Sequence, residues 1–94
     1  MNLNKIVAEF RRQLIDYIYC KLEECDKSKD INITLIVDKD DIDLASEVTY
    51  NNIYTNEYGD IYLRSYDKDG YFEPEEDAIE LFSIDELIKI AEKL

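Results

Sequence analysis

A long amphipathic stripe at the start of the chain is the feature that most constrains the fold. Apolar residues recur at steps of three and four, which is the spacing of one helix face. The stripe consists of Leu3, Val7, Phe10, Leu14, Ile18, Leu22 and Cys25. It predicts a helix over about residues 3 to 25, roughly 35 Å long, with Asn2 as its N-cap. So long a helix in a chain of 94 residues either crosses a sheet diagonally or projects toward a partner.

Two segments after a polar connector at residues 26–30 are predicted to be strands. Residues 31–37 alternate in the manner of a half-buried strand. A second strand is predicted over residues 47–55, and the adjacent Asn51 and Asn52 mark a place where it would bulge or break.

The two glycines of the chain mark hairpin turns. Gly59 follows Glu57-Tyr58 and Gly70 follows Lys68-Asp69, and each turn requires a residue with positive φ. Residues 60–66 form the strand between these turns. A further strand is predicted to begin at residues 71–73 and to stop at Pro74.

The C-terminal end has the clearest boundary in the sequence. Residues 78–82 are predicted to form a short last strand. Ser83 and Glu86 then have the spacing of a capping box, with Ser83 as N-cap. The helix that follows has an apolar face formed by Ile84, Leu87, Ile88, Ala91 and Leu94.

These elements predict a single α+β domain over residues 1–94, because the chain is too short for two domains. The predicted order is a long N-terminal helix, an antiparallel sheet of three to five strands with two short hairpins, and a C-terminal helix. Both helices are expected to cover the aliphatic face of the sheet. The expected core brings Ile31, Ile33, Leu35, Val37, Ile53, Ile61 and Leu63 against Val7, Phe10, Leu14, Ile18, Leu87, Ile88 and Ala91.

A tyrosine-rich face is predicted for the first hairpin. A three-residue turn ending at Gly59 would place Tyr54 opposite Tyr62, Tyr50 opposite Tyr66, Asn52 opposite Arg64 and, on the other side, Ile53 opposite Leu63. Aromatic cross-strand pairs stabilise a hairpin by about 0.2–1 kcal/mol each. Tyrosine is also enriched at protein interfaces. The sequence therefore leaves two interpretations of these tyrosines open, packing and binding.

The charge of the chain is strongly negative and unevenly distributed. There are 23 acidic and 11 basic residues, a net charge of −12, while residues 1–37 are neutral overall. Two acidic clusters stand out: Asp38, Asp40, Asp41 and Asp43, and then Glu73, Glu75, Glu76 and Asp77. Such a field repels nucleic acid and anionic lipid and attracts basic proteins. Solvated loops that keep a small protein in solution are the alternative interpretation.

Catalytic chemistry has little support in the sequence. The chain has no histidine and no glycine-rich phosphate loop, so we expect no enzymatic activity and no cofactor. Cys20 and Cys25 lie five apart in one predicted helix, a spacing that disfavours a disulfide. The start lacks a signal-peptide pattern, and the longest apolar stretch, residues 31–37, is too short to span a bilayer. We therefore expect a cytoplasmic protein with reduced thiols.

A partial match to a calcium-binding EF-hand loop begins at Ser65. The candidate ligands are Ser65, Asp67, Asp69, Glu73 and Glu76, with Gly70 at the sharp turn. Serine stands where the motif requires aspartate, and the preceding segment alternates like a strand instead of a helix. A hairpin turn explains the same residues.

The leading functional hypothesis is an acidic protein-binding module. It would inhibit or sequester a basic nucleic-acid-handling protein, in the manner of immunity, anti-restriction or anti-defence proteins. The predicted contact residues are the four tyrosines of the hairpin and the two acidic clusters, with no direct binding of nucleic acid or membrane. One alternative is a homodimer or larger homo-oligomer built on the long helix, and a second is a weak calcium-binding module.

Overall fold

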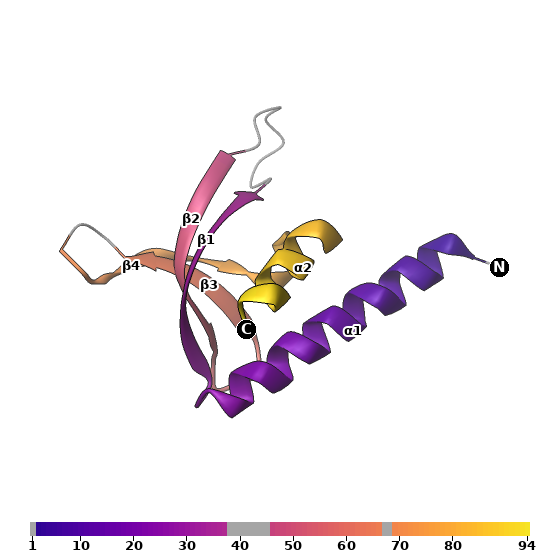
Figure 1. Cartoon of the computed structure of the whole chain (residues 1–94), viewed down its shortest axis with the longest axis horizontal. Coiled ribbons are helices and arrows are strands. Elements are labelled where there is room, and N and C mark those ends of the chain that lie inside the picture. The colour runs from indigo at the N-terminus through magenta and orange to yellow at the C-terminus, as the bar shows by residue number, and fades with distance from the viewer. Residues whose placement is uncertain (1, 38–45, 67–68) are drawn as a thin grey trace.

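A computed structural model describes residues 2–37, 46–66 and 69–94, with the backbone alone at residues 37, 46 and 72–75. The elements in chain order are α1 (Leu3–Glu24), β1 (Ser28–Val37), β2 (Ser46–Thr55), β3 (Ile61–Tyr66), β4 (Phe72–Ala78), η1 (Ile79–Leu81) and α2 (Ile84–Lys93). The strands form an antiparallel sheet in the order β1-β2-β3-β4 (Figure 1). The predicted α+β architecture is therefore confirmed. Within these residues, no helix is long and apolar enough to cross a membrane.

The boundaries of α1 follow from local chemistry at each end. Asn2 Oδ1 accepts a hydrogen bond from the Asn4 amide at 3.0 Å, which confirms the predicted N-cap. Asp26 and Lys27 adopt the left-handed conformation, with φ of 56° and 69°, so the chain leaves the helix abruptly. As a result β1 begins at Ser28, earlier than the predicted residue 31. Both cysteines are free thiols, as their spacing indicated.

The first hairpin has the predicted register. Tyr54 lies opposite Tyr62, and the neighbouring pairs also match: Ile53 opposite Leu63 and Asn52 opposite Arg64. Gly59 has a φ of +84°, which is a conformation that side chains with a Cβ rarely adopt. Turn length and glycine position therefore fix which residues face each other across β2 and β3.

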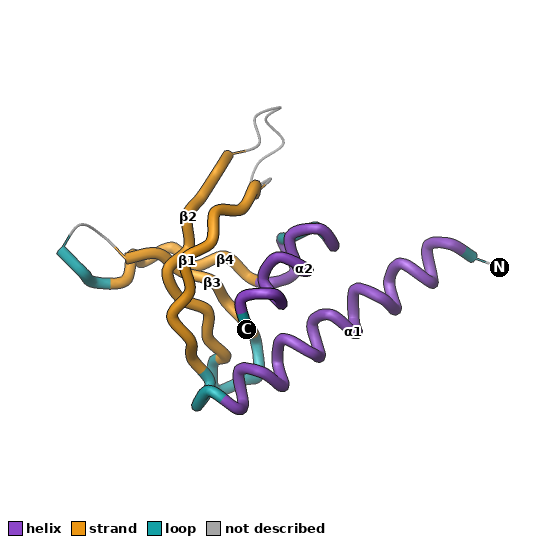
Figure 2. Tube along the Cα trace, viewed as in Figure 1, coloured by secondary structure: helices purple, strands orange, loops and turns teal. Residues whose placement is uncertain are grey.

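A β-bulge interrupts the pairing of β1 with β2. Asp30 pairs with Asn52, but the next pair is Ile33 with Tyr50, so two residues of β1 oppose Asn51 alone. A bulge or break was expected in β2 at Asn51 and Asn52. The extra residue lies in β1 instead, opposite Asn51. Tyr50 and Ile53, three positions apart on β2, both belong to the single core cluster. Figure 2 shows β1 and β2 curving together away from β3 and β4.

Two predictions about the fourth strand were wrong. β4 continues through Pro74 instead of stopping there, because it is an edge strand and the β3–β4 register is irregular between Arg64 and Tyr66. A proline at such a place removes no hydrogen bond that the ladder requires. The predicted strand over 78–82 is replaced after Ala78 by the 3-10 turn η1.

The start of α2 confirms the predicted N-cap. Ser83 Oγ accepts a hydrogen bond from the Glu86 amide at 3.3 Å. Leu87 and Ile90 on the inner face of α2 are fully buried, so this helix closes the core over the sheet.

Only the second half of α1 contributes to the core. Ile18 and Leu22 are fully buried, whereas Val7 and Phe10 are 51% and 46% exposed. The prediction that Val7 and Phe10 pack against the sheet is therefore wrong. Figure 1 shows the reason, because α1 extends past α2 and its N-terminal end lies away from the sheet.

Arg11 joins α1 to the segment that leads into α2. Its Nη1 donates a hydrogen bond to the Phe82 carbonyl at 2.5 Å and its Nη2 donates to the Glu80 carbonyl at 2.6 Å. Hydrogen bonds from a charged donor contribute about 1.5–3 kcal/mol each. Arg11 therefore marks the point at which the packed half of α1 begins.

The neighbouring arginine provides a matched control for this contact. We predict that Arg11→Met lowers the free energy of unfolding by about 2 kcal/mol, because two backbone carbonyls lose a charged donor. Arg12→Met should cost much less, since the partners of Arg12 among the described residues, Glu9 and Asp16, are both exposed. Urea denaturation of both variants measures the difference, and equal costs would contradict the assigned role of Arg11.

Candidate functional site

Tyr50 and Asp77 lie in the interior of the protein. Tyr50 is 1% exposed, its ring meets that of Phe82 edge-on at 5.6 Å, and its hydroxyl donates a hydrogen bond to Asp77. Burial, followed by this hydrogen bond to a carboxylate, raises the pKa of Tyr50 far above its usual range. Asp77 is itself only 7% exposed. The prediction that Tyr50 belongs to an exposed face opposite Tyr66 is therefore wrong, since its ring lies in the core beside the irregular stretch of the β1–β2 pairing.

Tyr54 and Tyr62 form the centre of the outer surface of the hairpin. Their rings stack with centroids 6.0 Å apart, and both side chains are half-buried. The Arg64 guanidinium lies over the Tyr54 ring, 4.1 Å from its centroid, and 3.9 Å from a Glu76 carboxylate oxygen. The Tyr54 hydroxyl donates to Glu76 at 2.5 Å. Burial and this hydrogen bond raise the pKa of Tyr54 to about 12.

Asp30 and Asn52 extend this network toward β1. Asp30 Oδ1 accepts hydrogen bonds from Asn52 Nδ2 and from the Tyr66 hydroxyl, each at 2.9 Å. These two donors lower the pKa of Asp30 below its usual value, and the same bond to Asp30 raises the pKa of Tyr66. Asn52 Oδ1 in turn accepts from Arg64 Nε at 3.0 Å, which connects the two halves of the network.

We call this surface the tyrosine face. It consists of Tyr54, Tyr62, Tyr66, Arg64, Asp30 and Glu76, with the buried Asn52 linking Asp30 to Arg64. Hydrogen bonds hold the phenol groups of Tyr54 and Tyr66 in fixed orientations beside two carboxylates. An aromatic, partly exposed and locally acidic surface of this kind is suited to binding cationic side chains. Sequence reasoning missed Asp30, because it was assigned to the connector and the early start of β1 has no marker in the sequence.

The predicted acidic clusters contribute less to this face than expected. Glu76 lies on it, whereas Asp77 is buried against Tyr50. Glu73 and Glu75 are known here only by their backbone positions in β4. Asp38, Asp40, Asp41 and Asp43 lie outside the described residues.

The segment that partly matches a calcium-binding loop lies between two strands. β3 precedes it and β4 follows it, whereas an EF-hand loop joins two helices. Ser65 Oγ donates to the Thr49 carbonyl at 2.6 Å, and Glu76 accepts from Tyr54. Asp67 lies outside the described residues, as do the side chains of Glu73 and its neighbours, and Asp69 is exposed. Across residues 2–37, 46–66 and 69–94, no three acidic or cysteine side chains are grouped to hold a metal ion.

Comparison with known proteins gives no indication of the function. No family model matches the chain, and no curated protein or solved structure matches it either.

The raised pKa values of Tyr50 and Tyr54 make a prediction about alkaline pH. Both groups favour the neutral phenol in the folded state, so the stability they contribute is complete below about pH 10 and is lost as the pH rises toward 12 and above. Near-ultraviolet titration of the folded protein should therefore show late-titrating phenolates among its eight tyrosines. Tyr54→Phe should remove one of them. A single step near pH 10 for all eight tyrosines of the folded protein would contradict this assignment.

Proposed function

We propose that the protein is an acidic protein-binding module that blocks the basic surface of a nucleic-acid-handling protein. The observation that carries the proposal is the tyrosine face, in which three partly exposed tyrosines lie beside Asp30 and Glu76. The interaction would inhibit the partner by competing with nucleic acid for the same arginine and lysine side chains.

Arg64 illustrates how such a face would bind an arginine of the partner. Its guanidinium stacks over the Tyr54 ring while one nitrogen approaches Glu76. Cation–π contact and charge pairing thus act on the same guanidinium, and such contacts strengthen as an interface excludes water. A second arginine, supplied by the partner, would meet the same chemistry on Tyr62 and Tyr66.

The hydrogen bonds of the tyrosine face reduce the entropy cost of binding. Tyr54 and Tyr66 are already held by Glu76 and Asp30, so little side-chain freedom is lost when a partner docks. Tyrosine also contributes a large contact area for few rotatable bonds. Both properties are typical of residues that dominate the energy of an interface.

The distribution of charge favours a basic partner. Glu57 and Asp60 lie exposed in the turn before β3, and Asp69 lies exposed in the turn after it. Acidic residues therefore stand at both ends of the strand that carries Tyr62 and Tyr66. Together with the net charge of −12, they would speed the approach of a cationic surface and repel nucleic acid itself.

Tyr62 and Tyr58 provide a matched test of this proposal. Immobilised protein should retain a basic partner from an extract of the source cells, and nucleic acid should displace it. Tyr62→Ser should weaken the affinity for that purified partner by about 30-fold, the size of a hot-spot residue. Tyr58→Ser should leave it unchanged, because Tyr58 is 79% exposed at the turn and outside the tyrosine face. Calorimetry on the purified partner measures both affinities.

Charge provides a second readout on the same partner. Glu76→Gln keeps an acceptor for the Tyr54 hydroxyl but removes the negative charge, so it should weaken binding at low salt more than at high salt. The proposal fails if the partner binds Tyr62→Ser as tightly as the unchanged protein. It also fails if the partner binds this protein and nucleic acid at the same time.

A further inference from the structure

Arg64 lies in a site on the tyrosine face whose contacts suit a guanidinium group. Its Cζ is 4.1 Å from the centroid of the Tyr54 ring, and its Nε donates a hydrogen bond to Asn52 Oδ1 at 3.0 Å. Its Nη1 lies 3.9 Å from a carboxylate oxygen of Glu76. A flat cation with several donors along its edges fits these contacts, whereas the compact ammonium group of lysine reaches fewer of them at once.

Asn52 holds its acceptor in place through bonds to β1. Its side chain is buried, at 2% exposure, and its Nδ2 donates to Ser28 Oγ at 3.1 Å and to Asp30 Oδ1 at 2.9 Å. Because both amide hydrogens are used in this way, Oδ1 is directed toward Arg64 and requires a donor from that side. The site therefore specifies a hydrogen-bond donor at a fixed position.

Arg64 fits this site incompletely. The separation of 3.9 Å between its Nη1 and Glu76 is too long for a hydrogen bond. The second carboxylate oxygen of Glu76 accepts from the Tyr54 hydroxyl. The side chains of Arg64 and Glu76 are 20% and 32% exposed, so both can be reached from the solvent. An arginine that approached from the solvent would form the charge-assisted hydrogen bond to Glu76 that Arg64 leaves unmade.

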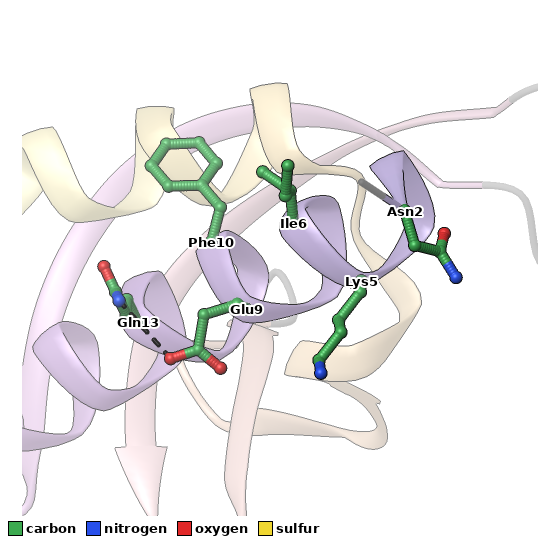
Figure 3. A pocket seen from close by; sticks show the side chains of 6 residues that line it. All are labelled: Asn2, Lys5, Ile6, Glu9, Phe10 and Gln13. Carbon is green, nitrogen blue, oxygen red and sulfur yellow. Dashed lines mark hydrogen bonds between the residues drawn. The ribbon is translucent and has the colours of Figure 1, made fainter.

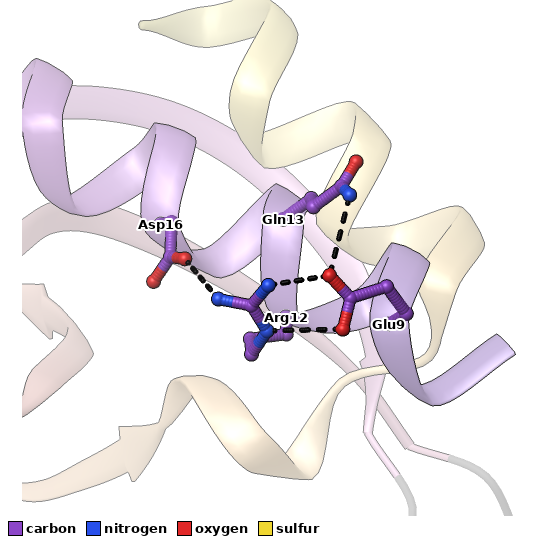
Figure 4. Close-up of polar contacts among 4 residues, drawn as sticks. All are labelled: Glu9, Arg12, Gln13 and Asp16. Carbon is purple, nitrogen blue, oxygen red and sulfur yellow. Dashed lines mark hydrogen bonds and ion pairs between the residues drawn. The ribbon is translucent and has the colours of Figure 1, made fainter. Parts of the chain in front are cut away.

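A second arginine beside carboxylates, on α1, provides a comparison. Glu9 belongs to the lining of an open hollow of about 690 Å³, which Figure 3 shows. Exposed residues form this lining: Asn2, Lys5, Ile6, Glu9, Phe10 and Gln13. Arg12 pairs with Glu9 and Asp16 (Figure 4), and its side chain is 62% exposed. Among the described residues, no aromatic ring lies over Arg12 and no buried amide accepts from it. Carboxylates alone therefore do not create such a site.

We propose that the tyrosine face contains a guanidinium-binding site that Arg64 fills within the chain, and that an arginine of the partner enters it by displacing Arg64. The incoming guanidinium lies over Tyr54, donates to Asn52 and pairs with Glu76. Arg64 thus competes with the partner and lowers its apparent affinity. The inference rests on the proposed function for the source of the arginine, whereas the site itself is tested without the partner.

Two capped amino acids test whether the site takes a guanidinium group. Nα-acetylarginine amide and Nα-acetyllysine amide carry the same charge and differ in the cationic group. Titrations followed by nuclear magnetic resonance at the ring signals of Tyr54 and Tyr62 give their dissociation constants. Arg64→Ala should bind the arginine derivative at least about tenfold more tightly than the unchanged protein, because the site is no longer occupied. The lysine derivative should gain less than about threefold, because it benefits from the lost charge alone.

Arg64→Lys separates occupation of the site from loss of charge. This variant keeps the charge but not the flat group, so the arginine derivative should again bind more tightly. Arg12→Ala is the matched control, because it removes an arginine from two carboxylates without opening a site under a ring. It should leave the dissociation constant unchanged. A nuclear Overhauser effect between the Tyr54 and Tyr62 rings shows that each variant retains the tyrosine face.

Three results would overturn the proposal. The first is the absence of a gain for the arginine derivative in a variant that retains the tyrosine face. The second is an equal gain for the lysine derivative in Arg64→Ala. The third is loss of the contact between the Tyr54 and Tyr62 rings in both Arg64 variants, because Arg64 would then hold the face together instead of competing for it. Capture of a basic partner and its dependence on Tyr62 are measured separately, so failure here is distinct from failure of the proposed function.

Discussion

The tyrosines of β2 are divided between the core and the outer surface at the level where the β1–β2 pairing changes register. Ile31 and Asn32 together oppose Asn51 at this level, and the alternation along β2 breaks there, since Tyr50 and Ile53 are both buried although they lie three positions apart. Tyr50 turns inward to Phe82 and Asp77, while Tyr54 remains outside with Glu76 and Arg64. This break in β2 places Tyr50 in a packing group and leaves Tyr54 in a candidate binding group.

The protein consequently presents two surfaces of different chemistry on different elements. The tyrosine face lies on β1 to β4 and combines phenol rings with fixed carboxylates. The first half of α1 carries exposed aliphatic and aromatic side chains, among them Leu3, Val7 and Phe10. Arg11 separates the two regions, because its contacts with the Glu80 and Phe82 carbonyls mark where α1 begins to pack.

The parts of the fold that sequence could predict are those fixed by local rules. Gly59 and the turn length set the pairing of Tyr54 with Tyr62, and Ser83 set the start of α2. Tyr50 was misplaced because the alternation of β2 was carried through Asn51 and Asn52, although these residues mark the place where the strand was expected to bulge or break. Periodicity identified the apolar side of α1 but not what covers it, since a stripe buried in the core and one left exposed have the same spacing. The role of Asp30 depends on contacts with Asn52 and Tyr66 from other strands, which no local pattern contains.

Cross-strand nuclear Overhauser effects across β1 and β2 test the central claim most directly. Asp30 faces Asn52, and the bulge then predicts contacts of the Tyr50 backbone with Ile33, together with contacts of the Tyr50 ring with Phe82. An uninterrupted ladder would instead pair Tyr50 with Asn32, and a regularly alternating β2 would place the Tyr50 ring on the same side as Tyr54. Observation of that second pattern would contradict the account of how the tyrosine face arises.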